Sequence, residues 1–315
     1  MQYSNSPLEP VSDFFRKHKP IGEILALILL VGALAFCWVI GYVLEKKEAG
    51  FAKYTYIEVP LSEEELEQEF SYLAVSDLDQ NTDSSESVKI SLDEKDGLLE
   101  ISEGGNYTLS GKMIGQIKIN APDQVVHLFL DGAEISSKSG PAINCIDAAK
   151  LIITLVDGSE NTISDSGDYR QYVDEEACIY STCDMTINGK GSLNVYGYYK
   201  DAIRSKDLVR ILDGNFYIKC KRTAVHGNDG ILVSGGEFMI SSEKYGFKTT
   251  KLGADGRGSL VISGGDMSII AGRSAFVTTK ANVYIYNCSI KSHSVVSTYD
   301  IGGLHKEQEG CVDER

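Results

Sequence analysis

The sequence predicts an all-β fold, a parallel β-helix, preceded by one N-terminal transmembrane helix. Three observations predict this fold: an uncharged apolar run near the N-terminus, an internal repeat of about 22 residues, and an unusual glycine and proline content. The chain has 31 glycines and only 6 prolines in 315 residues. Many tight turns without proline are typical of short strands joined by Gly, Asn and Asp.

The apolar run extends from Ile24 to Leu44 and contains no charged residue. At about 1.5 Å per residue, a helix of this length spans roughly 30 Å, the thickness of one bilayer core. We therefore expect a transmembrane helix over 21–44, after a cytoplasmic segment over 1–20. The flanking basic residues only weakly favour a cytoplasmic N-terminus. A cleaved signal peptide stays open as an alternative, as does a lipoprotein, although Phe36 is a poor residue to precede a lipidated Cys37.

An acidic segment follows the apolar run. Residues 45–87 hold 12 acidic and 3 basic side chains, a composition that predicts a solvated stalk or linker. The chain beyond this stalk would lie outside the cell, in a protein of the cell membrane. We expect residues 301–315 to form a C-terminal tail.

The repeat is marked by a small residue followed by a large apolar one. The pairs are Ala142-Ile143, Cys178-Ile179, Ala202-Ile203, Ala224-Val225, Gly246-Phe247 and Ala275-Phe276. Strands with alternating apolar residues follow each pair on both sides of a Gly-containing turn. A unit of this length cannot bury its apolar face alone. The units must therefore stack with parallel strand pairing, which predicts a β-helix over 88–300. A β-sandwich is the alternative, but the in-phase repeat argues against it.

Stacked coils place equivalent residues in columns about 4.7 to 4.9 Å apart. One column, five or six residues after each small residue, reads Asp147, Asp184, Asp207, Asp229, Lys251 and Lys280. Stacked carboxylates repel one another, and a divalent cation such as Ca²⁺ relieves the repulsion. Asp201 lies one corner away and could complete a coordination shell. We therefore expect calcium ligands at Asp184, Asp201, Asp207 and Asp229; the alternative is that each Asp only accepts hydrogen bonds within its own turn.

A second column lies two residues after each small residue. It reads Asn144, Tyr180, Arg204, His226, Lys248 and Val277. Because the preceding apolar residue faces inward, we expect this column to face outward. Aromatic rings can stack on sugar rings, and Arg or Lys can pair with carboxylates, so the column predicts carbohydrate binding by Tyr180, Arg204, His226 and Lys248. An ordinary solvated surface is the alternative. Further stacking candidates are Tyr196, Tyr198, Tyr199, Tyr217, Tyr284 and Tyr286.

Several longer strings carry a family resemblance. They are VKISL (88–92), NYTLSGKMIGQIKI (106–119), VVHLFLDGAEI (125–135), LVDGSENTISD (155–165), ACIYSTCDMTINGKGSLNVYG (177–197), YKDAIRSKDLVRILDG (199–214) and AVHGNDGILVSGGEFMI (224–240). Over 88–290 the chain resembles the bacterial carbohydrate-binding domain family of extracellular right-handed β-helix proteins.

The resemblance implies a right-handed coil, a fold similar to family 9 pectate lyases, bound calcium, and binding of cellulose and polygalacturonate. It also implies that the family's acidic turn positions fall on the four aspartates named above. Two departures, Cys183-Asp184 and Lys244-Tyr245-Gly246, remove acidic residues that the family tends to have. Fewer metal sites than in the described family member are therefore expected.

The charge distribution limits the partners. A net charge of −15 argues against a nucleic-acid partner, which needs a basic surface. Residues 88–200 have 9 basic and 17 acidic side chains, whereas residues 201–300 have 13 basic and 9 acidic ones. An acidic polysaccharide would therefore be attracted to the later coils. The seven cysteines lack the spacing of a zinc site, and we expect mostly free, buried thiols.

The leading hypothesis is a membrane-anchored extracellular protein with a monomeric ectodomain that binds cellulosic or acidic polysaccharide. A structural protein of the cell envelope is one alternative. A polysaccharide lyase is another, with Arg204, Lys206 or Lys248 removing a proton near Ca²⁺. No catalytic residue is assigned, because the sequence shows no single sheltered base.

Overall fold

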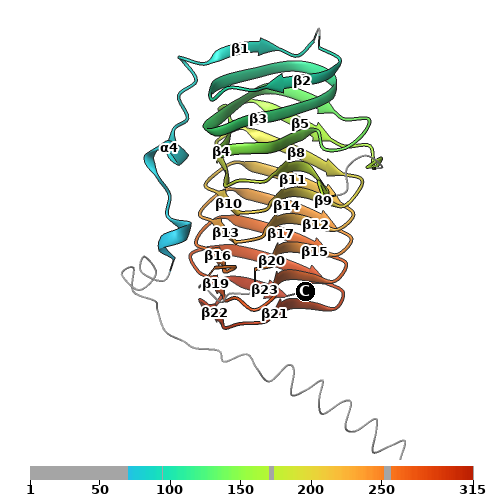
Figure 1. The fold of residues 1–315 in the computed structure, drawn as a ribbon. Coiled ribbons are helices and arrows are strands. Elements are labelled where there is room, and N and C mark those ends of the chain that lie inside the picture. Colours follow the sequence, from blue (N-terminus) through green and yellow to red (C-terminus); the bar gives the residue numbers. More distant parts are fainter. Residues whose placement is uncertain (1–69, 94, 170–173, 252–256, 315) are drawn as a thin grey trace, which may run out of the picture. The chain divides into compact units, whose positions relative to one another are not determined.

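The computed structural model describes residues 70–93, 95–169, 174–251 and 257–314. In these residues the strands β1 to β23 form one continuous sheet of parallel pairs that winds into a stack of coils (Figure 1). From β6 onward each coil contributes three strands, and each strand pairs with the equivalent strand of the next coil. The prediction of an all-β parallel solenoid is confirmed.

The stack has three faces. Face I consists of β7 (Met185–Gly189), β10 (Leu208–Ile211), β13 (Gly230–Val233), β16 (Leu260–Ile262), β19 (Val283–Ile285) and β22 (His305–Glu307). Face II consists of β5 (Glu160–Ser164), β8 (Ser192–Gly197), β11 (Asn215–Cys220), β14 (Glu237–Ser242), β17 (Asp266–Ala271), β20 (Ser289–Ser294) and β23 (Val312–Glu314). Face III consists of β6 (Ala177–Ser181), β9 (Asp201–Ser205), β12 (Thr223–Gly227), β15 (Tyr245–Thr249), β18 (Ser274–Thr278) and β21 (Ser297–Ile301).

The first coils are formed by longer elements. They are β1 (Val88–Ser91), β2 (Gly97–Ile101), β3 (Gly105–Ser136) and β4 (Ile143–Leu155). The start of β4 pairs with β6 and its end pairs with β7, so β4 turns the corner between faces III and I. The remaining elements are a 3₁₀ turn, η1 (Ser71–Leu73), and a short helix, α4 (Asp77–Gln80), which precede the first strand.

The interior of the stack is a set of apolar columns. The large residues of the predicted pairs lie in register, and one such column reads Ile143, Ile179, Ile203, Val225, Phe247 and Phe276. All six side chains have no exposed area. Burial of one such side chain contributes about 1.5–3 kcal/mol, so each coil adds a similar increment to a single continuous core.

Glycine is required where turns of neighbouring coils approach closely. Gly236 and Gly265 occupy the predicted turn position in successive coils and have φ of +101° and +97°. A Cβ atom at Gly265 would lie 2.7 Å from the carbonyl oxygen of Gly236. Both the positive φ and the short distance exclude larger residues, which explains the recurring Gly-Gly turns.

Residues 70–87, which we name the strap, pack along face I. Phe70 and Leu73 are buried in a small apolar cluster with Leu208, Val261 and Tyr284. The rings of Phe70 and Tyr284 lie 4.7 Å apart in an edge arrangement. The strap therefore reaches from β19 toward the first coils, as Figure 1 shows for α4 and the strand β1 that follows it. At Phe70, Leu73 and Asp79 the segment that was expected to be a solvated stalk is instead buried against the coils.

A buried carboxylate fixes the strap to the coils. Asp79 has no exposed area, and both its oxygens lie 2.9 Å from Lys150 Nζ. Thr186 Oγ1 donates to Asp79 at 2.6 Å, and Asn188 Nδ2 donates to the Asp79 carbonyl oxygen at 2.6 Å. Burial raises the pKa of Asp79, but hydrogen bonds from Ser76, Thr186 and Lys150 outweigh it and lower the pKa to about 2.

An arginine extends the same attachment. The Arg210 side chain is 4% exposed and donates to the carbonyl oxygens of Tyr72 and Leu73 at 3.0 and 3.1 Å. Backbone groups of the strap thus find partners on face I rather than in water.

Three further expectations can be compared with the fold. The expected tail over 301–315 is not separate, because β22 and β23 pair with β19 and β20 and continue the stack. The six cysteines in the described part of the chain are free thiols, five of them buried, as predicted. The expected membrane helix over 21–44 lies outside the described residues. None of the helices within them is long and apolar enough to cross a bilayer.

We predict that Asp79→Ala lowers the free energy of unfolding by about 3 kcal/mol or more, because it leaves Lys150 without its buried counter-charge. Urea unfolding monitored by circular dichroism measures this. Asp77→Ala, an exposed change in the same short helix, is the control and should cost about 0.5 kcal/mol or less. Equal effects of the two changes would show that the strap contributes nothing to stability.

The same pair predicts an acid effect. The pKa of Asp79 is about 2 in the folded chain against an ordinary value of 3.8. Its stabilising contribution is therefore complete above about pH 4 and is lost as the pH falls toward 2. The difference in stability between the native chain and Asp79→Ala should shrink over that range.

Candidate functional site

The predicted binding column lies on face III, with the predicted register. Asn144, Tyr180, Arg204, His226, Lys248 and Val277 are neighbours on successive strands. However, the expectation that the whole column faces solvent is wrong. Tyr180 and His226 are only 1% and 4% exposed, whereas Arg204 and Lys248 are half-buried. Lys206 Nζ lies 5.9 Å from the centre of the Tyr180 ring, and Thr250 Oγ1 lies 3.3 Å from His226 Nε2, so neighbouring side chains cover both residues.

Asp201 is the buried centre of this face. Its carboxylate has no exposed area and accepts hydrogen bonds from Arg222 Nε at 2.7 Å and Arg222 Nη2 at 2.8 Å. Nδ1 of His226 lies 3.0 Å from the second oxygen. Burial raises the pKa of Asp201, but Arg222 and His226 outweigh it and hold the pKa well below its usual range. Burial also lowers the pKa of His226 despite its acidic partner.

This arrangement argues against direct coordination of calcium by Asp201. Its oxygens are directed at Arg222 and His226, and a cation in their place would be repelled by the guanidinium group. Sequence reasoning missed Arg222, because it lies in a turn just before β12 and outside the repeat positions that were aligned.

A second carboxylate joins three basic residues above Asp201. Glu176 accepts hydrogen bonds from Lys200 Nζ, from Arg204 Nη1 at 3.1 Å and from Arg222 Nη1 at 2.7 Å. Burial raises the pKa of Glu176, but Lys200 and Arg222 outweigh it and lower the pKa. Sequence reasoning missed Glu176 too, since it belongs to the insertion before β6 and to no column.

The predicted aspartate column is present at the turns between faces III and I. Asp184 pairs with Arg210 at 2.9 Å, and Asp229 pairs with Lys251 at 3.0 Å and with Arg257 at 3.2 Å. Asp207 lies between them, and burial together with the charges of Asp184 and Asp229 raises its pKa. The repulsion foreseen from the sequence is therefore real, and basic side chains neutralise its two outer members.

Metal binding by this column stays a prediction. Among the described residues, no group of three or more His, Cys, Asp or Glu side chains is arranged to hold a metal ion.

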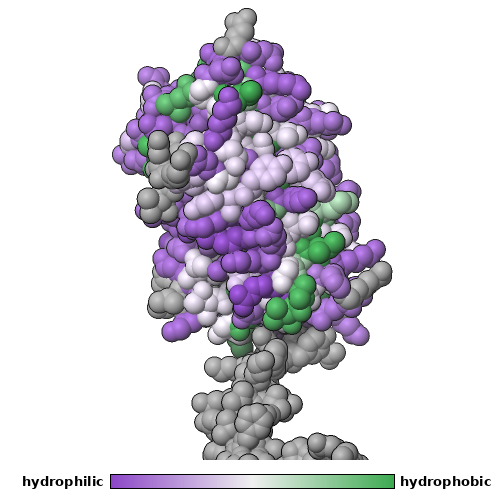
Figure 2. All heavy atoms as spheres, turned by 90° about the vertical axis from the view of Figure 1, so that its right-hand side faces the viewer, coloured by the Kyte–Doolittle hydropathy of each residue, from purple (hydrophilic) through white to green (hydrophobic). Residues whose placement is uncertain are grey.

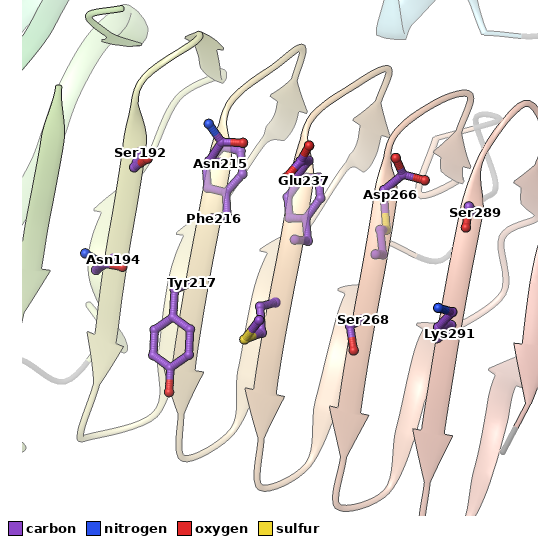
Figure 3. Close-up of a pocket in the computed structure, with 13 residues that line it drawn as sticks. Ser192, Asn194, Asn215, Phe216, Tyr217, Glu237, Asp266, Ser268, Ser289 and Lys291 are labelled. Carbon is purple, nitrogen blue, oxygen red and sulfur yellow. The ribbon is translucent and has the colours of Figure 1, made fainter. Parts of the chain in front are cut away.

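Face II carries an open groove of about 520 Å³. Figure 3 shows Asn194, Tyr217, Ser268 and Lys291 in one row across neighbouring strands, and Asn215, Glu237, Asp266 and Ser289 in a second row. Met239 continues the first row, pairs in register with Tyr217 and is 60% exposed. The groove thus presents an aromatic ring and a thioether beside amides, hydroxyls and carboxylates.

Tyrosines connect this groove to the adjacent corner. The Tyr196 ring lies 5.9 Å from Tyr217 and 6.1 Å from Tyr198. Just beyond, Tyr199 stacks on Tyr169 at 4.1 Å. Tyr196, Tyr198, Tyr199 and Tyr217 were among the expected stacking candidates, whereas Tyr169 was not. Tyr284 was too, but it is 1% exposed because the strap covers it.

The surface between these sites is polar. The side of the stack shown in Figure 2 is mainly hydrophilic, and its hydrophobic side chains form separate patches rather than one broad area. Such a surface suits a hydrated ligand better than a large apolar protein interface.

The lyase candidates differ in their surroundings. Arg204 is held by Glu176, and Lys206 lies over the Tyr180 ring. Lys248 Nζ lies 4.9 Å from the centre of the Tyr245 ring, and burial together with Arg222 and Arg204 lowers its pKa.

Comparisons with known proteins agree with this geometry. A family model described as carbohydrate-binding domain-containing protein matches residues 95–308. A carbohydrate-binding domain-containing protein of Acetivibrio thermocellus is 32% identical over 144 residues, which is 42% of this chain and 50% of that protein. The chain thus spans about half the length of that relative. The solved structure of a polysaccharide lyase-like protein from C. thermocellum, a gadolinium derivative, matches with a TM-score of 0.70 and 27% identity, over 73% of this chain and 99% of the other.

Proposed function

Because the chain belongs to the family of carbohydrate-binding domain-containing proteins, we propose that it binds polysaccharide along the groove of face II. The observation that supports this location is the double row of side chains that crosses successive coils. Its members are presented at the spacing of adjacent strands, about 4.7–4.9 Å, on a flat part of the sheet. An elongated surface of this kind suits a polymer better than a compact small molecule.

The chemistry of the two rows fits sugar rings. Tyr217 and Met239 offer an aromatic and an apolar surface for the C–H face of a sugar. Asn194, Asn215 and Glu237 are all lining residues with groups that can exchange hydrogen bonds with hydroxyls. Backbone pairing fixes the spacing of the row, so the backbone needs little ordering on binding.

The sugar is cellulosic or acidic in this proposal. Neutral chains would use the groove alone, whereas chains with carboxylates would gain from Arg204 and Lys248 on face III. Tyr180 and His226, which are buried there, would position these basic residues rather than touch the sugar. The soluble part would act as a monomer.

We predict that Tyr217→Ala weakens binding of the full chain to soluble cellulosic or pectic polysaccharide about tenfold, because the stacking surface is lost. Affinity electrophoresis measures the change. Leu98→Ala, which removes a 56% exposed side chain on β2, is the matched control and should leave affinity unchanged. Equal losses for both variants, or no binding by the native chain, would contradict the proposed site.

Calcium enters the proposal through the column of Asp184, Asp207 and Asp229. Asp207 is the member whose charge the neighbouring basic residues leave least compensated, as its raised pKa indicates. Asp201 would act indirectly, by holding Arg222.

We predict that Ca²⁺ at about 100 times its Kd stabilises the chain by about 2.7 kcal/mol. Thermal unfolding with Ca²⁺ and with EDTA measures this. In Asp207→Asn the response to Ca²⁺ should fall, while stability in EDTA should hold or rise, because the change removes an unfavourable charge. Identical melting curves in Ca²⁺ and EDTA would refute the calcium proposal.

Membrane anchoring rests on the uncharged run over 24–44. The proposal places the binding domain outside the cell on a single-pass anchor. The full chain should then stay with membranes through an alkaline carbonate wash and dissolve in detergent, whereas a chain lacking residues 21–44 should be released. Release of the full chain by carbonate would count against an anchor.

A further inference from the structure

Glu176 differs from the other acids of face III in where it comes from. It lies in the insertion between β5 and β6, one residue before β6 begins, whereas Asp201 is part of β9. Its carboxylate is nevertheless the meeting point of three basic residues from two successive coils. Lys200 and Arg204 belong to the coil of β9, and Arg222 precedes β12.

The three basic residues do not all have the same acidic partners. Asp201 already accepts from Nε and Nη2 of Arg222, which leaves Nη1 for Glu176. The ion pairs of Lys200 and Arg204 within the described residues are with Glu176. Nε of Arg204 is buried without a hydrogen-bond partner there. If the Glu176 carboxylate moved away, Arg222 would keep Asp201 as its counter-charge, whereas Lys200 and Arg204 would lose the acid with which they form ion pairs in the described residues.

The place that Glu176 fills can be reached from solvent. Its side chain is 22% exposed, and those of Lys200 and Arg204 are 32% and 20% exposed. Tyrosines lead from the groove toward this place: the Tyr196 ring lies 5.9 Å from that of Tyr217 in the groove and 6.1 Å from that of Tyr198, and Lys200 Nζ lies 4.8 Å from the centre of the Tyr199 ring. A polymer chain that leaves face II past Tyr196 and Tyr198 would arrive here.

We propose that Lys200, Arg204 and Arg222 form a subsite for the carboxylate of a uronic acid unit, and that Glu176 occupies it as an internal competitor. This inference rests on the proposed polysaccharide binding and adds a regulation to it. A carboxylated sugar gains the charge-assisted hydrogen bonds only after it displaces Glu176, whereas a neutral sugar has no means of displacing it. The acid therefore weakens acidic ligands selectively.

The test compares Glu176→Gln with Glu175→Gln in the full chain. Both changes remove one negative charge at adjacent positions, so the second measures the general electrostatic effect. Affinity is measured for polygalacturonate and for its fully methyl-esterified form, which lacks the charges. We expect Glu176→Gln to bind polygalacturonate about tenfold more tightly and Glu175→Gln to change affinity about twofold or less. Neither change should alter binding of the ester.

Two further variants keep the result interpretable. Adding Arg204→Gln to Glu176→Gln should abolish the gain, because the subsite loses a donor. Glu176→Asp retains the charge but shortens the side chain, and a partial gain is expected if the Gln variant does not fold.

Equal affinities of Glu176→Gln and Glu175→Gln for polygalacturonate would overturn the inference, and the native chain's binding of the ester would show that the proposed function stands. If no form of the chain binds either polymer, the proposed function fails and the inference with it.

Discussion

The stacking of coils at one strand spacing is the constraint on which the rest of the structure depends. Parallel pairing in register gives every side chain a neighbour of equivalent position about 4.7–4.9 Å above and below. This spacing stabilises apolar columns such as Ile179, Ile203 and Val225, because each coil adds side chains to the same buried core. Charged columns are destabilised by the same spacing, because it places like charges close enough to repel one another strongly. Each polar feature of the molecule can be understood as a response to this spacing.

The faces of the stack differ in how their polar and charged columns are accommodated. On face I the strap packs over outward side chains, and its fully buried Asp79 has Lys150 as a counter-charge. At the turns, Arg210 and Lys251 pair with two of the stacked aspartates, Asp184 and Asp229. On face II the outward columns mix amides, an aromatic ring, hydroxyls and acids, although Glu237 and Asp266 are neighbours in register. The same mixture of side chains can exchange hydrogen bonds with sugar hydroxyls. A face whose outward columns are mixed in this way is therefore also suited to polysaccharide binding.

The sequence was sufficient for those features that repeat. The small-large pairs predicted the strands, their parallel pairing and the register of two columns, because periodicity reports the core directly. The sequence did not predict the positions and contacts of groups that occur only once. The strap is the end of the acidic segment 45–87, whose composition as a whole resembles a solvated linker. The contacts of the strap depend on tertiary partners such as Thr186 and Arg210. Tyr180 and His226 were placed in the right column with the wrong exposure, because the side chains that cover them, Lys206 and Thr250, come from the next coil.

The insertion before β6 shows why function tends to lie in such departures from the repeat. A column provides only side chains that point in the same direction, and face III by itself would present Arg204 and Lys248 to solvent beside the buried Asp201. A carboxylate brought in from the insertion can sit above that surface without belonging to it. The Glu176 carboxylate is held by side chains, whereas the Glu176 carbonyl oxygen accepts a hydrogen bond from the Asp201 backbone N–H. The carboxylate can therefore be exchanged for another one while the backbone stays in place. The solenoid thus supplies a rigid set of donors, and the non-repeating segment supplies the group that decides when they are available.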